Sequence, residues 1–255
     1  MLTDKQVCFS KRLKCYDDFF QQDINLGKYK EKQRAMSPAC RQAGLSCEQE
    51  NLMMKKLPID FYQRSNVLQI AKELLGKILI TKWNSIETSG RIVEVEAYNG
   101  KIDKASHASG GRRTNRNEIM YGNGGFAYVY LCYGIHHLFN VVTNKKETPH
   151  AILIRAIEPL KGIDGMLERT GKEKPDSTLT RGPGNVSKAL GISFRQHNGH
   201  SLVSNDLFIA EDGFVFSKRE IMASPRIGVD YAGDDALVPY RFYIKGNPFV
   251  SGKPK

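Results

Sequence analysis

Beyond about residue 57 the chain alternates between short apolar runs and polar turns. Five runs rich in Val, Ile, Leu and Tyr follow one another, bounded by Gly, Asn or Thr-Pro positions that favour turns. Residues of these types are enriched in β-strands. We therefore predict strands at KILITKW (77–83), GRIVEVEAY (90–98), GFAYVYLCY (125–133), HLFNVVTN (137–144) and HAILIRAIEP (150–159), and later strands at LFIAE (207–211) and RFYIKG (241–246).

Helical periodicity flanks this series of strands. In SNVLQIAKELLGK the apolar residues recur at three- and four-residue spacing, which predicts a helix over 66–75 that Ser65 or Asn66 caps and Gly76 ends. Shorter helical segments are predicted at about 162–170 and 184–190. Strands in succession, with helices before and after them, favour an α+β fold. We expect a single compact domain with a curved, mostly antiparallel β-sheet flanked by helices.

The first fifty or so residues differ from the rest. They hold four of the five cysteines, mixed charges and no sustained periodicity. We interpret residues 1–52 as an N-terminal extension, disordered or the product of a misassigned start codon, and residues 53–255 as the functional domain. The cysteine spacing matches neither a zinc motif nor a disulfide framework.

The net charge of the chain indicates the class of molecule that it binds. Lys and Arg number 38 against 27 Asp and Glu, a formal net charge of +11 over 255 residues. Such an excess favours polyanionic partners such as nucleic acid, although it also serves solubility alone. No apolar run approaches the ~18 residues of a membrane span, and the charged N-terminus lacks a signal-peptide core. We expect a soluble intracellular protein.

One predicted strand carries an unusual face. In RIVEVEAYNG (91–100) one face is apolar, while Glu94, Glu96 and Tyr98 share the other. A polar loop follows that contains His107 and the three arginines Arg112, Arg113 and Arg116. The residues alone leave two interpretations open: a solvated strand face beside a basic loop, or a carboxylate placed for chemistry. We assign Glu94 to the solvated face.

Two further features suggest a site. Tyr128, Tyr130 and Tyr133 lie on the next strand, where tyrosines usually pack but can also stack on bases beside a basic surface. Arg155 lies in an apolar strand, where its charge requires a carboxylate partner, either Glu96 or Glu158.

Six blocks taken together are specific. RIVEVEAY, DKASHASGGRRTNRN, YVYLCYG, ILIRAIEPL, RGPGNVSKALGI and PRIGVDYAG with RFYIKGNPFVS resemble the alkyladenine (3-methyladenine) DNA glycosylase family in order and approximate spacing, from Leu57 to Ser251. The resemblance implies base-excision DNA repair. It implies a monofunctional enzyme that flips damaged purines such as 3-methyladenine, 7-methylguanine and hypoxanthine out of DNA and hydrolyses the N-glycosidic bond, leaving an abasic site.

The same resemblance assigns roles to residues. Glu96 is the expected general base for the attacking water, and Arg155 the residue that helps to hold that water. The expected base pocket comprises Tyr98, His107, Tyr130 and Asn140, the expected DNA-intercalating residues are Tyr133 and Ile135, and the expected contacts to the DNA backbone are Arg112, Arg113 and Arg116.

The resemblance, together with the absence of an apolar span and the size of a single domain, sets the expected surroundings of the protein. The partner is double-stranded DNA with damaged purines, the protein is a monomer that needs no metal or organic cofactor, and no membrane is involved. It would work in the cytoplasm at the nucleoid of a bacterium, or in the nucleus of a eukaryote.

Two alternatives remain. The first is a DNA-binding module that does not cut, although a full pocket would then have no purpose. The second is a sugar hydrolase, for which Glu94 would be the only close second carboxylate to Glu96.

Overall fold

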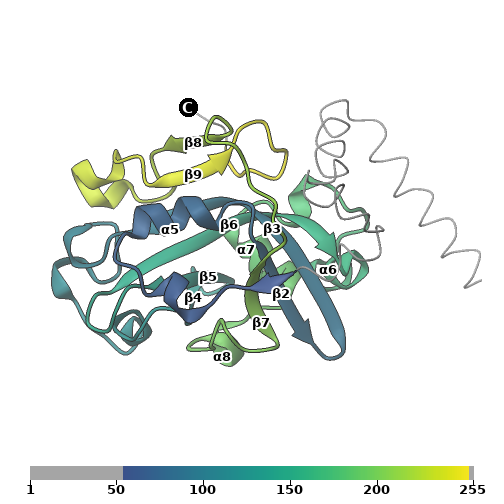
Figure 1. The fold of residues 1–255 in the computed structure, drawn as a ribbon, viewed down its shortest axis with the longest axis horizontal. Coiled ribbons are helices and arrows are strands. Elements are labelled where there is room, and N and C mark those ends of the chain that lie inside the picture. Colours follow the sequence, from purple (N-terminus) through teal and green to yellow (C-terminus); the bar gives the residue numbers. More distant parts are fainter. Residues whose placement is uncertain (1–53, 253–255) are drawn as a thin grey trace, which may run out of the picture. The chain divides into compact units, whose positions relative to one another are not determined.

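A nine-stranded antiparallel sheet runs through residues 54–252, the part of the chain that this computed structural model describes (Figure 1). The sheet does not close into a barrel, and with its helices it confirms the predicted α+β class. The interpretation of residues 1–52 lies outside the described residues. Among residues 54–252, no helix has the length and apolar character required to cross a membrane.

The strands do not pair in simple chain order. The main path across the sheet runs β1 (Lys55–Lys56), β7 (Leu207–Glu211), β2 (Ile78–Trp83), β3 (Ile86–Tyr98), β6 (His150–Lys161), β5 (His136–Thr143) and β4 (Ala127–Cys132). Off this path, β9 (Arg241–Ile244) pairs with both β3 and β8 (Ile221–Ser224). All seven predicted strands are present, and β1 and β8 are additional.

Helices pack on and around this sheet. The α-helices are α4 (Ile59–Tyr62), α5 (Val67–Leu74), α6 (Ile163–Thr170), α7 (Pro183–Leu190) and α8 (Phe194–His197). Short 3₁₀ turns lie in the connections at η2 (Gly100–Ile102), η3 (Ser109–Gly111), η4 (Glu118–Tyr121), η5 (Ser177–Leu179) and η6 (Asp230–Ala236). The three predicted helical segments are confirmed as α5, α6 and α7.

Helix α5 shows why the sequence signals worked. The side chain of Asn66 accepts a hydrogen bond from the backbone N–H of Gln69, which satisfies a free donor in the first turn. The apolar stripe is buried, and the helix packs against β3 and β6. Gly76 then adopts a φ of +89°, a left-handed conformation that costs glycine nothing and ends the helical path.

Strand β3 is the central element of the site. Every residue from Thr88 to Ala97 is buried, so both faces of the strand are covered. Strand β6 lies along one edge, while the other edge pairs with β2 in its first half and with β9 in its second. The expectation of a solvated face at Glu94 is therefore wrong, because Glu94 is fully buried, with β6 and β9 along its two edges.

The pairing of β3 with β6 contains three irregularities, one between Ser89 and Gly90 and two on either side of Glu94, and the latter two change the direction of side chains at the site. Ile92 pairs with Ile157 and Glu94 with Ala156, which leaves Val93 as an extra residue on β3. Val95 then pairs with Ile154, which leaves Arg155 extra on β6 and restores the register. Bulges of this kind redirect side chains and occur often beside functional sites.

Candidate active site

Glu96 is a fully buried carboxylate that receives three hydrogen bonds. Its Oε2 accepts from the Tyr98 hydroxyl at 3.0 Å and from Arg155 Nη1 at 3.2 Å, and its Oε1 accepts from the backbone N–H of Ile227 at 2.8 Å. An ionised carboxylate offers about four acceptor positions, so these contacts fix its orientation and leave room for one further donor. The carboxylate is positioned by strand, loop and side chain together.

Arg155 lies between two carboxylates. Its Nη1 contacts Glu96, and its Nε lies 3.2 Å from Glu94 Oε1. Burial alone would lower the pKa of the guanidinium, but the charges of Glu96 and Glu94 outweigh it and raise the pKa. The predicted partner Glu96 is confirmed, whereas Glu158 instead accepts from Asn247.

Tyr98 stands beside Glu96, as its position two residues along the strand predicted. Burial raises the pKa of Tyr98 well above its usual value, and the neighbouring charge of Glu96 raises it further. Tyr98 therefore stays protonated at neutral pH and donates a hydrogen bond to Glu96. The guanidinium of Arg226 lies 4.9 Å from the centre of its ring, which holds the ring from one side.

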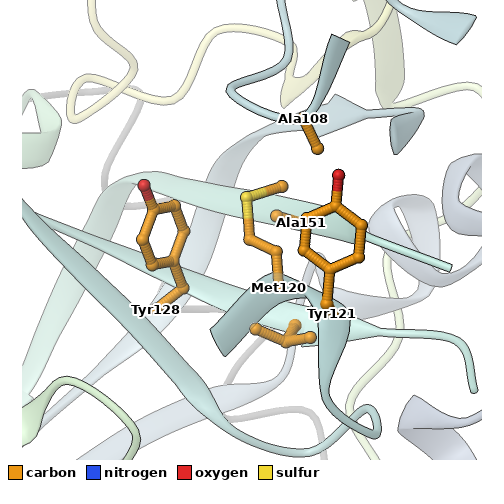
Figure 2. Close-up of a cluster of buried hydrophobic side chains, with 6 residues drawn as sticks. Ala108, Met120, Tyr121, Tyr128 and Ala151 are labelled. Carbon is orange, nitrogen blue, oxygen red and sulfur yellow. The ribbon is translucent and has the colours of Figure 1, made fainter. Parts of the chain in front are cut away.

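The loop that carries His107 is anchored by a buried cluster (Figure 2). Figure 2 shows Met120 between the rings of Tyr128 and Tyr121, with Ala108, the neighbour of His107, close to the hydroxyl end of Tyr121. The polar residue Asn117 adds hydrogen bonds from its side-chain amide to the backbone carbonyls of His107 and Arg112. The position of His107 is therefore set by packing as well as by polar contacts.

The protonation of His107 follows from its neighbours. Burial, followed by the charges of Arg116 and Arg112, lowers the pKa of His107 to about 4, and burial raises the pKa of Tyr128 to about 12. The Tyr128 hydroxyl lies 2.8 Å from His107 Nδ1, and its raised pKa keeps its proton in place, so that it can donate to Nδ1. The neutral imidazole then carries its proton on Nε2, where it can serve as a donor.

Tyr130 and Asn140 complete the group of predicted pocket residues. The Tyr130 ring lies 4.7 Å from the His107 ring at an interplanar angle of 70°, an edge-to-face contact. The side-chain amide of Asn140 donates to the backbone carbonyls of Tyr128 and Leu138, which fixes this buried side chain on β5. The aromatic residues therefore form one packed group next to Glu96 and Tyr98.

The β4–β5 hairpin presents apolar side chains to solvent. Tyr133 is 91% exposed and Ile135 is 71% exposed. Tyr133 adopts a φ of +51° and Gly134 one of +73°, and a non-glycine residue in this region carries strain that often marks a functional site. An exposed aromatic residue in a strained turn is costly in water and is well placed to contact a partner.

The three loop arginines differ in their partners. Arg113 pairs with both Glu118 and Glu147. Arg112 and Arg116 have no carboxylate within ion-pair distance in the described part of the chain, and Arg116 lies 5.0 Å from the centre of the Tyr130 ring. Arg116 is therefore at the pocket as well as on the basic loop.

Several residues at the site carried no recognisable signal in the sequence. They are the backbone N–H of Ile227 and the buried ion pair of Asp103 with Arg226, which ties the loop after β3 to the loop before η6. A further group lies close to Glu96, in which Glu94 accepts hydrogen bonds from Arg241 and Ser251. Within residues 54–252, no three His, Cys, Asp or Glu side chains gather to hold a metal ion, and the cofactor-free reaction stays a prediction.

Comparison with known proteins identifies the family. The model of the family described as "Methylpurine-DNA glycosylase (MPG)" matches residues 60–248, and three Bacillus proteins are 47% identical to the chain over 205 residues, which make up 77% of this chain and 98% of each relative. The chain belongs to the methylpurine-DNA glycosylase family. The three relatives, from Bacillus cereus (strain G9842), Bacillus anthracis (strain A0248) and Bacillus thuringiensis (strain Al Hakam), carry the name "Putative 3-methyladenine DNA glycosylase".

Membership of the methylpurine-DNA glycosylase family confirms the resemblance seen in the sequence. It makes DNA the partner and DNA repair the process, and the type of reaction is hydrolysis of a bond between base and sugar. The matched region contains Glu96, the aromatic group and the β4–β5 hairpin. It ends just before Ser251.

Proposed function

We propose that this protein is a monofunctional DNA glycosylase that removes damaged purines, of the 3-methyladenine, 7-methylguanine and hypoxanthine class, from double-stranded DNA. The observation that carries the proposal is the orientation of Glu96. It is a buried carboxylate held by Tyr98, Arg155 and the N–H of Ile227 next to a group of aromatic rings. The 3-methyladenine part of the proposal also draws on the name of the relatives.

In the proposed reaction a water molecule attacks the sugar C1′ of the flipped nucleotide. The bond from C1′ to the purine nitrogen breaks, its electron pair leaves with the purine, and Glu96 accepts the proton of the water. A cationic alkylated purine leaves as a neutral base, whereas hypoxanthine takes up a proton from solvent or protein as it leaves. Arg155 helps to hold that water beside the carboxylate. A base alkylated at a ring nitrogen is already cationic and leaves readily, so orientation of the water supplies most of what the enzyme must add.

The proposed pocket uses the remaining predicted residues. Tyr98, His107 and Tyr130 would stack on or wall the flipped base, and the fixed amide of Asn140 would exclude guanine by contact with its 2-amino group. Tyr133 and Ile135, exposed at the hairpin, would fill the gap in the duplex, which offsets the few kcal/mol lost in unstacking. Arg112, Arg113 and Arg116 would contact the DNA backbone.

The wider expectations enter the proposal unchanged. We propose that residues 53–255 act as a monomeric glycosylase domain without a metal or organic cofactor. In a bacterium, as in the Bacillus relatives, it would act on the nucleoid. A sugar hydrolase with Glu94 as second carboxylate is disfavoured, because Glu94 is fully buried and its oxygens already accept from Arg155, Arg241 and Ser251.

A single-turnover assay on end-labelled duplexes that contain hypoxanthine or a methylated purine tests the proposal. Wild type should yield strand cleavage only after alkali treatment, which reveals abasic sites. Glu96→Gln should slow base release by about 10² to 10⁴-fold, the usual contribution of a general base, without loss of DNA binding. The matched control is Glu87→Gln, because Glu87 lies on the same strand but pairs with surface lysines.

Two results would contradict the proposal. If wild type bound the duplex and left every damaged base in place, a non-catalytic DNA-binding module would be the better description. If strands broke without alkali in step with base release, the enzyme would also have lyase activity, and the monofunctional assignment would be wrong.

A further inference from the structure

Glu94 is a second fully enclosed charge next to Glu96. Its side chain is fully buried, and it accepts four hydrogen bonds. Arg155 Nε donates to Oε1 at 3.2 Å, Arg241 Nε donates to Oε1 at 2.7 Å, the Ser251 hydroxyl donates to Oε1 at 2.9 Å, and the Ser251 backbone N–H donates to Oε2 at 2.6 Å. Because the side chain is fully buried among these donors, it does not meet a substrate or bulk water, and Glu94 acts only on these neighbours.

Ser251 connects the end of the described chain to this group. Its hydroxyl accepts from Arg155 Nη2 at 3.3 Å and from Arg155 Nε at 3.4 Å, and its carbonyl accepts from Arg241 Nη2. Phe249 is buried, and the side chain of Asn247 accepts from the Phe249 N–H, so the approach to Ser251 is anchored. A segment more than 90 positions beyond Arg155 thus contacts its guanidinium.

These contacts divide the guanidinium of Arg155 between two tasks. Its Nε and Nη2 face Glu94 and Ser251, and its Nη1 alone contacts Glu96. An unconstrained arginine prefers to grip a carboxylate with two parallel N–H groups. Such a grip on Glu96 would occupy the acceptor position that the attacking water needs and would oppose the transfer of a proton to that carboxylate.

We propose that Glu94 and Ser251 are positioning residues, which hold Arg155 by its Nε and Nη2 so that only Nη1 reaches Glu96. We call Glu94 and Ser251 together the Glu94–Ser251 clamp. Arg241 supports this clamp, because it donates hydrogen bonds to the Glu94 carboxylate and to the Ser251 carbonyl. The inference rests on the proposed function, because it gives the clamp a role only if Glu96 works with a water. It makes Ser251, near the end of the described residues, part of the catalytic apparatus through Arg155.

The test compares single-turnover base release, duplex affinity and thermal midpoint for two clamp variants. Ser251→Ala removes only the hydroxyl, and we expect base release about tenfold slower. Glu94→Gln keeps the shape but removes the charge and places an NH₂ group against the Ser251 N–H, and we expect about 10²-fold slower release, the loss typical of an ~1 Å misplacement. Affinity for the damaged duplex should stay within about twofold, because both residues are buried.

Two controls separate positioning from stability. Ser224→Ala removes a hydroxyl that accepts from Arg241 Nη1 and has no contact with Arg155, so base release should be unchanged. Asp212→Asn breaks the ion pair of Asp212 with Arg91, a β3 residue that has no hydrogen bond to the clamp in the described part of the chain, and should lower the thermal midpoint without slowing base release by folded protein. Slow release in both clamp variants with normal release in both controls supports the clamp.

The remaining outcomes overturn the clamp. If Glu96→Gln is inactive while Ser251→Ala and Glu94→Gln work at the wild-type rate, the proposed function stands and the clamp does not. The clamp also fails if the two variants lose activity only in proportion to lost folded protein. If Glu96→Gln itself works at the wild-type rate, the proposed function fails, and the clamp fails with it.

Discussion

The folded protein holds His107 neutral, and this makes its stability depend on pH. Burial, Arg116 and Arg112 lower the pKa of His107 to about 4 from an ordinary value of 6.5. At pH values between these two pKa values, the His107 imidazole is mostly protonated in the unfolded chain and mostly neutral in the folded protein. The stabilisation is therefore complete above pH 6.5 and is lost as the pH falls towards 4.

The size of the effect follows from the two pKa values. At pH 5 the imidazole is roughly 97% protonated in the unfolded chain and roughly 9% protonated in the folded protein, which corresponds to about 2 kcal/mol of stability lost relative to pH 7.5. His107 is partly exposed, so screening by water makes this an upper value. A loss of this size is a large fraction of the ~5–15 kcal/mol stability of an ordinary domain.

Urea unfolding at pH 7.5 and pH 5.0 measures this loss for wild type and for His107→Gln, which does not titrate. Wild type should lose up to about 2 kcal/mol more than the variant. His150 and His197, whose pKa values burial also lowers, are present in both proteins and cancel in the comparison. Equal losses in the two proteins would refute a neutral His107 held by burial and by the loop arginines.

Two further predictions concern the surface that would meet DNA. Tyr133→Ala should leave the free energy of unfolding, measured with urea, within about 0.5 kcal/mol of wild type, because the ring is 91% exposed. The same variant should slow base release at least tenfold in single-turnover assays. A lower stability with unchanged excision would contradict this prediction. Arg116→Gln should reduce the slope of log duplex affinity against log salt concentration by about one. Arg113→Gln should change this slope less, because Arg113 already pairs with Glu118 and Glu147. Equal slopes for the two variants would show that these ion pairs do not restrain Arg113.

The secondary structure was largely accessible from the sequence where local signals agree. The stripe and caps of α5 predict a helix within one residue of its observed ends, and LFIAE matches β7 throughout. Strand β8 (IMAS) is short and half exposed, and it has no alternation to detect. It exists because β9 offers it a partner, which is information that lies elsewhere in the chain.

The surroundings of Glu94 could not be predicted from local pattern. Alternation in RIVEVEAY places Glu94 and Glu96 on one face, but it does not show that β9 and β6 flank both residues or that bulges at Val93 and Arg155 shift the pairing. The partners Arg241 and Ser251 lie 147 and 157 positions away in the chain. The local sequence pattern therefore identified both carboxylates, but it wrongly predicted that Glu94 is exposed to solvent.

The presence of Glu94 follows from the free-energy cost of burying the Glu96 carboxylate. A buried Glu96 needs a cation nearby, because an unpaired carboxylate away from water costs several kcal/mol. A buried arginine that met Glu96 alone would satisfy this requirement by a two-pronged grip that also disables the carboxylate as a base. Glu94 resolves the conflict because it shares the charge of Arg155, and Arg241 in turn balances Glu94. On this argument, two acids and two arginines are the smallest neutral group that keeps one acid buried and still available for chemistry.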